Sequence, residues 1–373
     1  MSATYGIYVH VPWCRTRCPY CAFNVYVDDK PPYERWRDGV LAGWADVASA
    51  FSGNAHSLYF GGGTPSLAPP ALLQTIIGQL PLAPGAEITL EANPGATDAA
   101  MLQAFQQAGI TRLSLGVQTW NRAHARRLGR GHTIEQTEQL LRDVAALGFN
   151  SWSIDLMFGL PDQTLAELET DLQRLLALEP PHVSLYGLSI EPNTPFAQAQ
   201  DIGQLSLPDA ETWRTQYDRI QAVLEGHGWE RYEVSNYARP GHRAIHNEQV
   251  WRGGRYAGLG PGSHGFHPDG DRTLCAADWK EWDADPTPMR TRPTAEEAAV
   301  DYLLSSLRHI EGTQLDLLHA RGHTIGPQTL HTLKNHGLIT FSRTKVQLLP
   351  EAFPLADGIV RRLISGLEPT TNP

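Results

Sequence analysis

The chain has 373 residues, of which 41% are hydrophobic, and a formal net charge of −10. This length allows one large domain with a hydrophobic core and a smaller second domain. The acidic balance argues against nucleic-acid binding, and no apolar run is long enough to predict a membrane span. The first residues lead directly into a predicted strand, without a signal peptide, and four cysteines suit a reducing compartment, so we expect a cytoplasmic protein.

Short β-type runs alternate with helical patterns over roughly the first half of the chain. The predicted strands are 5–11, 57–60, 87–91, 112–116, 151–156 and 182–188. The predicted helices are 33–51, 72–80, 99–108, 134–147 and 165–178, the fourth ending at Gly148. Such β–α repeats predict a parallel sheet, either open or curled into a barrel, with functional residues at the carboxyl ends of its strands.

The second half of the chain has a different pattern. Residues 232–267 are rich in glycine, histidine, arginine and aromatic residues, and residues 283–288 have the composition of a linker. Beyond the linker come helical patterns at 295–307 and near 328–335, then a short alternating run at 346–348. This order predicts a small winged-helix-like domain. Because its basic residues are few and scattered, we expect a packing or lid role for it.

Three of the four cysteines lie within eight residues, directly after the first predicted strand. Cys14, Cys18 and Cys21 have the spacing C-x3-C-x2-C. Three thiolates so close together cannot all pair as disulfides, and they converge on a metal or an iron–sulfur cluster. A [4Fe-4S] cluster with three cysteine ligands leaves one iron open to a small molecule. The alternative is a structural zinc site that takes His10 or Cys275 as its fourth ligand.

Other polar or glycine-rich segments follow the predicted strands at their carboxyl ends. Three consecutive glycines, 61–63, precede Thr64, and such a run lets a ligand approach the backbone closely. Side chains suited to holding hydroxyl or ammonium groups come after the next strands: Glu91, Gln118, Arg130 and Asp155. Together they predict one binding site at this end of the sheet.

These motifs together resemble the radical S-adenosylmethionine (SAM) superfamily. The resemblance rests on the cysteine loop, the triple glycine with Thr64-Pro65, Glu91-Ala92-Asn93-Pro94, Gly116-Val117-Gln118 and the run 155–161. It is closest to the group that contains oxygen-independent coproporphyrinogen III oxidase and a related heme chaperone. It implies an α/β fold, a partial (β/α)6 TIM-type radical SAM barrel with a small C-terminal winged-helix-like domain. The expected divisions are 1–235, 236–288 and 289–373.

The resemblance also implies the cofactors and their ligands. Cys14, Cys18 and Cys21 would bind a [4Fe-4S] cluster, whose fourth iron would take the amino and carboxylate groups of SAM. The residues expected to contact SAM are Tyr8, Tyr20, Gly62, Gly63, Thr64, Glu91, Gln118, Arg130 and Asp155. In this family one electron enters the cluster, breaks a carbon–sulfur bond of SAM and makes a 5′-deoxyadenosyl radical. A flavodoxin or ferredoxin is the usual electron donor.

Local features favour the chaperone over the oxidase. Phe23 stands where the oxidase has a fourth cysteine, and the cluster loop begins too early for the oxidase's long leading segment. The run from His246 and Asn247 to Trp251 resembles a heme-binding motif, H-N-x-x-Y-W, in which Val250 replaces the tyrosine. His246 is the expected axial ligand, since imidazole binds heme iron well, and His264 is a second candidate.

The resulting hypothesis is a heme chaperone that binds heme, a [4Fe-4S] cluster and SAM and passes heme to an acceptor protein. One alternative is a radical SAM oxidase that decarboxylates coproporphyrinogen III to protoporphyrinogen IX without oxygen. Another is a radical SAM enzyme with an unidentified substrate, because the pocket rather than the fold sets the substrate.

Overall fold

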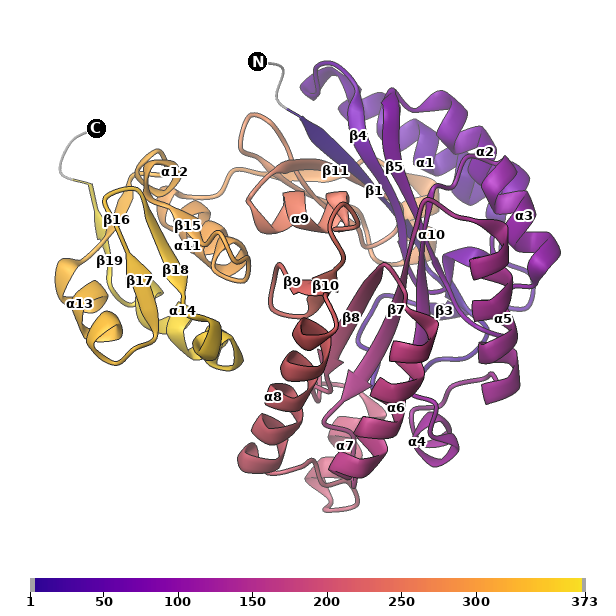
Figure 1. Cartoon of the computed structure of the whole chain (residues 1–373). Helices are drawn as coiled ribbons and strands as arrows, with labels where there is room; N and C mark the ends of the chain where they lie inside the picture. The colour runs from indigo at the N-terminus through magenta and orange to yellow at the C-terminus, as the bar shows by residue number, and fades with distance from the viewer. Residues whose placement is uncertain (1–3, 371–373) are drawn as a thin grey trace.

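The structure, a computed structural model, describes residues 4–370. Six parallel strands lie side by side in chain order at the centre of its large sheet (Figure 1). They are β1 (Tyr5–Val11), β4 (Ala55–Gly62), β5 (Leu82–Ala92), β6 (Arg112–Gln118), β7 (Ser151–Phe158) and β8 (His182–Gly187). Sequential order of parallel strands arises when each helical crossover runs in the same sense. This arrangement confirms the predicted α/β fold with a partial (β/α)6 radical SAM barrel.

The predicted helices form and cover the outer face of the sheet (Figure 1). The helices between the parallel strands are α1 (Tyr33–Val47), α2 (Pro70–Gln79), α3 (Ala99–Gln107), α4 (Arg122–Arg127), α5 (Ile134–Leu147) and α6 (Leu165–Leu178). Helix α5 begins at a capping box of Thr133 and Gln136 and ends at Gly148, whose φ of 66° is the left-handed conformation that glycine adopts readily. Both local signals stand in the sequence, which is why these boundaries were predictable.

The core fills the space between the sheet and these helices. Ile7 and Val9 of β1, Leu58 of β4 and Leu90 of β5 are fully buried. On the opposite face of the same strands, polar residues such as Tyr8 and Thr89 alternate with these buried apolar side chains. Each such side chain contributes about 1.5–3 kcal/mol relative to an exposed one.

The glycine- and histidine-rich second half contains more regular structure than its sequence suggested. Its elements are α7 (Pro195–Asp201), α8 (Ala210–Gly226), β9 (Glu230–Arg231), β10 (Asn236–Ala238), α9 (Ile245–Trp251), β11 (Arg255–Leu259), β12 (His264–Phe266), β13 (Arg272–Leu274) and α10 (Trp279–Ala284). Strand β11 pairs in parallel with β1, and β12 and β13 extend that edge of the sheet in antiparallel fashion. Strands β10 and β9 extend the other edge.

The C-terminal segment forms a compact group of small sheets and helices, as predicted for a winged-helix-like domain (Figure 1). Its elements are α11 (Ala295–Ser306), β15 (Thr313–Gln314), α12 (Leu315–His319), β16 (His323–Ile325), α13 (Pro327–Asn335), β17 (Ile339–Phe341), β18 (Lys345–Leu348), α14 (Ala356–Ile364) and β19 (Leu367–Pro369). Strand β14 (Met289–Thr291) instead pairs with β13 and completes the edge of the large sheet. The division of the chain at 235 and 288 stays a prediction. Among residues 4–370, no helix combines the length and apolarity that a membrane crossing requires.

Candidate functional site

A cavity of about 530 Å³ opens at the carboxyl ends of the parallel strands. It brings together predicted residues from widely separated segments of the chain: Cys14, Cys18, Tyr20, Cys21, Gly62, Gly63, Thr64, Glu91, Gln118, Arg130 and Asp155. They meet because parallel strands point their carboxyl ends to one edge, where the following loops converge. Tyr8 is the predicted SAM residue that does not line this cavity, and its hydroxyl lies 3.0 Å from Nδ1 of His10.

The cysteine loop carries the donors expected for an iron–sulfur cluster. It follows β2 (Trp13–Cys14), which pairs with β3 (Tyr26–Val27), and the backbone N–H of Cys21 donates to the carbonyl of Cys18 over 3.1 Å. The hydroxyl of Thr64 donates to Sγ of Cys14 over 3.5 Å, and Nη1 of Arg130 donates to Sγ of Cys18 over 3.8 Å. Burial raises the pKa of the Cys14 and Cys21 thiols, so a bound positive centre would be needed to hold them as thiolates.

These surroundings fit a [4Fe-4S] cluster. Hydrogen bonds to sulfur and partial exclusion of water are the features by which a protein tunes such a centre. Within residues 4–370, no three His, Cys, Asp or Glu side chains converge closely enough for a single metal ion. A cubane needs no such convergence, because its three cysteines bind different irons.

Arg130 connects the cysteine loop to the middle of the sheet. Its Nη2 donates to Oδ1 of Asn93 and, over 2.6 Å, to the carbonyl of Gly116. Its Nε is buried and has no hydrogen-bond partner among the described residues. A buried donor without a partner is costly, so this N–H would be stabilised by a ligand carboxylate in the cavity.

Two carboxyl groups face the same cavity from β5 and β7, the strands on either side of β6. Glu91 accepts hydrogen bonds from the hydroxyl of Tyr59 over 2.8 Å and from the backbone N–H of Gly62 over 3.1 Å. Burial raises the pKa of Glu91 to about 7, although the Tyr59 hydrogen bond opposes the shift. Burial also raises the pKa of Asp155, which accepts from the hydroxyl of Ser114 over 2.8 Å. A cationic ligand beside these groups would favour their ionised forms.

Gln118 reaches the cavity through an irregular strand end. The register between β6 and β7 shifts between Gly116 and Gln118, and Gln118 has a φ of 69°, which is unusual for a residue other than glycine. The next residues are held from α6, because Asp171 accepts from the Thr119 hydroxyl over 2.6 Å and from the Trp120 N–H over 2.9 Å. Strained backbone of this kind persists where its surroundings hold it, and it is common at functional sites.

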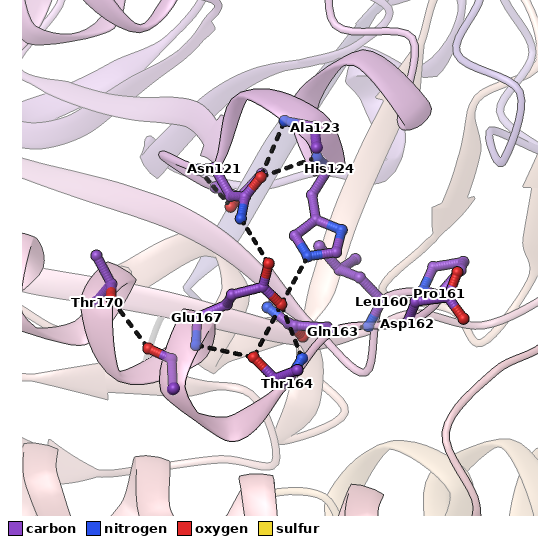
Figure 2. Close-up of polar contacts among 12 residues, drawn as sticks. Asn121, Ala123, His124, Leu160, Pro161, Asp162, Gln163, Thr164, Glu167 and Thr170 are labelled. Atoms are coloured by element: carbon purple, nitrogen blue, oxygen red, sulfur yellow. Dashed lines mark hydrogen bonds and ion pairs between the residues drawn. The ribbon is translucent and has the colours of Figure 1, made fainter.

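A network of helix caps ties together the loops that follow β6 and β7 (Figure 2). Oδ1 of Asn121 accepts from N–H groups in the first turn of α4, while its Nδ2 donates to Oε1 of Glu167 over 2.9 Å. The other carboxylate oxygen of Glu167 accepts from the N–H of Thr164 over 2.9 Å and lies 3.3 Å from Nε2 of His124. Helix α4 leads directly to Arg130, so this network helps to orient that side chain.

Several cavity residues were not among the predicted ones: Thr89, Asn93, Arg112, Ser114, His132, Met157, His182, Ser184 and Tyr186. Many occupy alternate positions of the predicted strands, so the two-residue period of a strand was the signal that could have found them. His182 is 1% exposed and contacts the hydroxyls of Ser153 and Tyr232, each over 2.8 Å. Burial holds the pKa of His182 well below its ordinary value.

The three predicted heme residues on α9 point in different directions. Only Asn247 lines the cavity. His246 is 5% exposed, with Nδ1 3.0 Å from the hydroxyl of Ser57, and burial lowers its pKa to about 3. The guanidinium carbon of Arg308 lies over the ring of Trp251, 5.8 Å from the centre of that ring. The imidazole of His246 is therefore neutral but enclosed, and its ligation of heme stays a prediction.

Comparisons with known proteins agree with this geometry. The family described as Radical SAM superfamily matches residues 8–175. The chain is 39% identical over 273 residues to "Heme chaperone HemW" of Escherichia coli (strain K12). The aligned region covers 71% of each protein. The chain belongs to the HemW family of the radical SAM superfamily.

Other relatives extend the same comparison. HemW of Bacillus subtilis (strain 168) is 33% identical over 265 residues, covering 69% of this chain and 70% of that protein. "Radical S-adenosyl methionine domain-containing protein 1, mitochondrial" of Bos taurus is 41% identical over 276 residues, covering 71% of this chain and 61% of that protein. A solved structure of coproporphyrinogen III oxidase (HemN) from Escherichia coli shares the fold, with a TM-score of 0.82, 21% identity and coverage of 98% of this chain and 91% of that chain.

Proposed function

We propose that this chain binds a [4Fe-4S] cluster, SAM and heme, and that it transfers the heme to an acceptor protein. The observation that carries the proposal is a cavity that combines three cysteines with Glu91, Arg130 and Asp155 in a member of the HemW family. The proposal includes a cytoplasmic location, which is supported by the reducing environment that free cysteines and iron–sulfur clusters require.

The residues of the cavity have separate roles in this proposal. Cys14, Cys18 and Cys21 would hold three irons, and the cluster with SAM would supply one-electron chemistry. Glu91 and Asp155 would attract the positively charged parts of SAM. The Nε–H of Arg130, which has no partner among the described residues, would donate to the carboxylate of SAM. A flavodoxin- or ferredoxin-type protein would donate the electron.

A second candidate is the decarboxylation of coproporphyrinogen III, which the agreement with the HemN fold over 98% of this chain favours. The cysteine pattern favours the chaperone, because Phe23, which is 64% exposed, occupies the position where the oxidase motif has a cysteine. An anaerobic assay with reductant, SAM and coproporphyrinogen III would detect vinyl-bearing products if the oxidase assignment is correct.

The test of the proposal is an anaerobic titration of the cluster-reconstituted protein with heme, followed through the Soret band. Saturation at one heme per chain would support a chaperone if the Soret band of the heme bound to this chain then disappears when an apo-acceptor protein is added. Absence of saturable binding, together with formation of vinyl products in the coproporphyrinogen assay, would replace the chaperone assignment with the oxidase.

A further inference from the structure

Positive charge is concentrated beside the cysteine loop, although the chain as a whole has a net charge of −10. The segments 12–27, which contains the three clustered cysteines, and 121–133, which contains α4, together carry six arginines and no aspartate or glutamate. Five of these arginines are exposed, and we call them the arginine rim: Arg15, Arg17, Arg122, Arg126 and Arg127.

The two segments of the arginine rim contact one another. A Cβ added at Gly129, just after α4, would lie 2.7 Å from Cδ of Pro19. A Cβ added at Gly131 would lie 3.7 Å from Oγ1 of Thr16. The arginines of the cysteine loop and those of α4 therefore belong to one surface. In Figure 1, α4 lies on the side of the molecule away from the C-terminal segment.

Three arginines of the rim are available to a partner. Arg17 and Arg126 make no side-chain hydrogen bond or ion pair with any residue between 4 and 370, and Arg15 donates only to the carbonyl of Gly95, over 2.7 Å. The other two arginines of the rim already pair with carboxylates. Because Arg17 and Arg126 hold no contact within the described chain, the fold gives no reason for their positions.

Two exposed apolar side chains lie beside the same loop. Phe23 is 64% exposed and Val27 is 57% exposed. Val27 is the register partner of Cys14 in the pairing of β3 with β2. Phe23, Arg15 and Arg17 are exposed and also line the cavity at the carboxyl ends of the strands, so they lie at its mouth. An exposed aromatic residue among arginines has the composition of a protein interface.

The position of this surface indicates what kind of partner it fits. Cys14, Cys18 and Cys21 are only partly buried, so a cluster bound to them would lie close to the arginine rim. Electron transfer slows steeply with distance, and a protein that reduces the cluster must therefore dock near these cysteines. Interfaces of electron-transfer proteins are small, and complementary charge brings the partners together. Such a partner would be acidic.

We propose that the arginine rim, with Phe23 and Val27, is the docking surface for a flavodoxin, an acidic one-electron carrier that contains a flavin. Arg17 and Arg126 would face its carboxylates, and Phe23 would contact the exposed apolar edge of the flavin. The flavin would arrive as the anionic hydroquinone, give one electron to the oxidised cluster and leave as the neutral semiquinone, without proton transfer. This inference rests on the cluster of the proposed function.

The first test measures binding of oxidised flavodoxin to the full, cluster-reconstituted chain by calorimetry at low ionic strength. The double variant Arg17→Gln/Arg126→Gln should weaken binding about tenfold, because it removes two charges from the docking surface. Added salt should weaken binding to the wild-type protein and reduce this difference, since the Debye length falls to about 10 Å at 0.1 M.

The matched control is Arg343→Gln/Arg361→Gln. Both arginines are exposed on the C-terminal segment and make no side-chain hydrogen bond or ion pair within residues 4–370. This variant changes the net charge of the chain equally and should bind flavodoxin like the wild type. Unchanged cluster absorbance would confirm that both double variants are intact.

The second test isolates the contact with the flavin. Phe23→Ala should weaken binding of flavodoxin about fivefold and leave binding of an acidic [2Fe-2S] ferredoxin, which has no flavin edge, unchanged. Met289→Ala is the control, because Met289 is 63% exposed on β14. In stopped-flow experiments, Phe23→Ala should slow cluster reduction by flavodoxin hydroquinone but not by dithionite, which needs no docking surface.

The outcomes separate this inference from the proposed function. Equal affinity of the wild type and Arg17→Gln/Arg126→Gln for flavodoxin, or equal losses in the two double variants, would overturn the docking surface and leave the chaperone function standing. Equal losses of flavodoxin and ferredoxin binding in Phe23→Ala would overturn the contact with the flavin. Absence of saturable heme binding, with flavodoxin docking as expected, would overturn the chaperone alone.

Discussion

Gly62 offers a sharp test of how the cavity is built. It ends β4 with a φ of 114°, and its N–H donates to Glu91. A Cβ at this position would lie 2.5 Å from Nδ1 of His10. That imidazole cannot move away easily, because Nε2 lies 2.8 Å from the carbonyl of Asn24 and Nδ1 lies 3.0 Å from the hydroxyl of Tyr8. Gly62→Ala should therefore destabilise the protein through both strain and overlap.

The two contributions can be given magnitudes. A side chain at positive φ costs about 1–2 kcal/mol, and overpacking a closely packed site costs about 1–3 kcal/mol, so Gly62→Ala should lower the free energy of unfolding by about 2–5 kcal/mol. Gly148 is the matched control, because its φ is also positive, at 66°, but a Cβ there would meet no atom within 4 Å. Gly148→Ala should cost only the first contribution, about 1 kcal/mol.

The assay is urea unfolding of the apo-protein, followed by circular dichroism at one pH for all three proteins. The difference between the two variants measures the overlap with His10 together with the greater backbone strain of a side chain at a φ of 114° than at 66°. Equal losses in Gly62→Ala and Gly148→Ala would refute the argument, since they would mean that the imidazole yields without cost.

Three further predictions concern the cavity and a buried acid outside it. Cys14→Ala should lose the cluster iron and its absorbance, whereas Cys275→Ala, which changes a buried thiol that does not line the cavity, should retain both in an iron and sulfide analysis. In calorimetry at about pH 8, Glu91→Gln should weaken SAM binding about tenfold. The affinity of the wild-type protein for SAM should fall as the pH drops below about 7, because Glu91 takes up a proton there, and the affinity of the variant should not show this pH dependence. Burial also raises the pKa of Glu233 to about 7 from 4.5, so the folded state binds an extra proton between these values. Stability should therefore decrease as pH rises through that interval, by at most about 3 kcal/mol, and urea unfolding of Glu233→Gln should show a smaller decrease.

Local patterns were sufficient to predict the repeating part of the fold. Strand β1 and helices α5 and α6 begin and end at the predicted residues, because an apolar run, capping boxes and a terminal glycine all act within a few residues of the chain. The segment after β8 was harder to predict. Helix α8 and strand β11 have weaker local patterns, and β11 is stabilised by pairing with β1, about 250 residues earlier in the chain.

Residue types and their spacing were enough to predict the available chemistry: three closely spaced cysteines, a glycine run, and polar side chains at the ends of successive strands. These are properties of residue type and spacing, and they predict a common site wherever parallel strands end together. Tertiary structure alone decided which side chains face that site. It placed Tyr8 and His246 beside Tyr59 but outside the lining of the first cavity, and it left His264 exposed beside a second cavity. These positions depend on how α9 and β11 pack against β1. Local sequence patterns do not predict how distant segments pack against one another, so these positions could be found only in the folded chain.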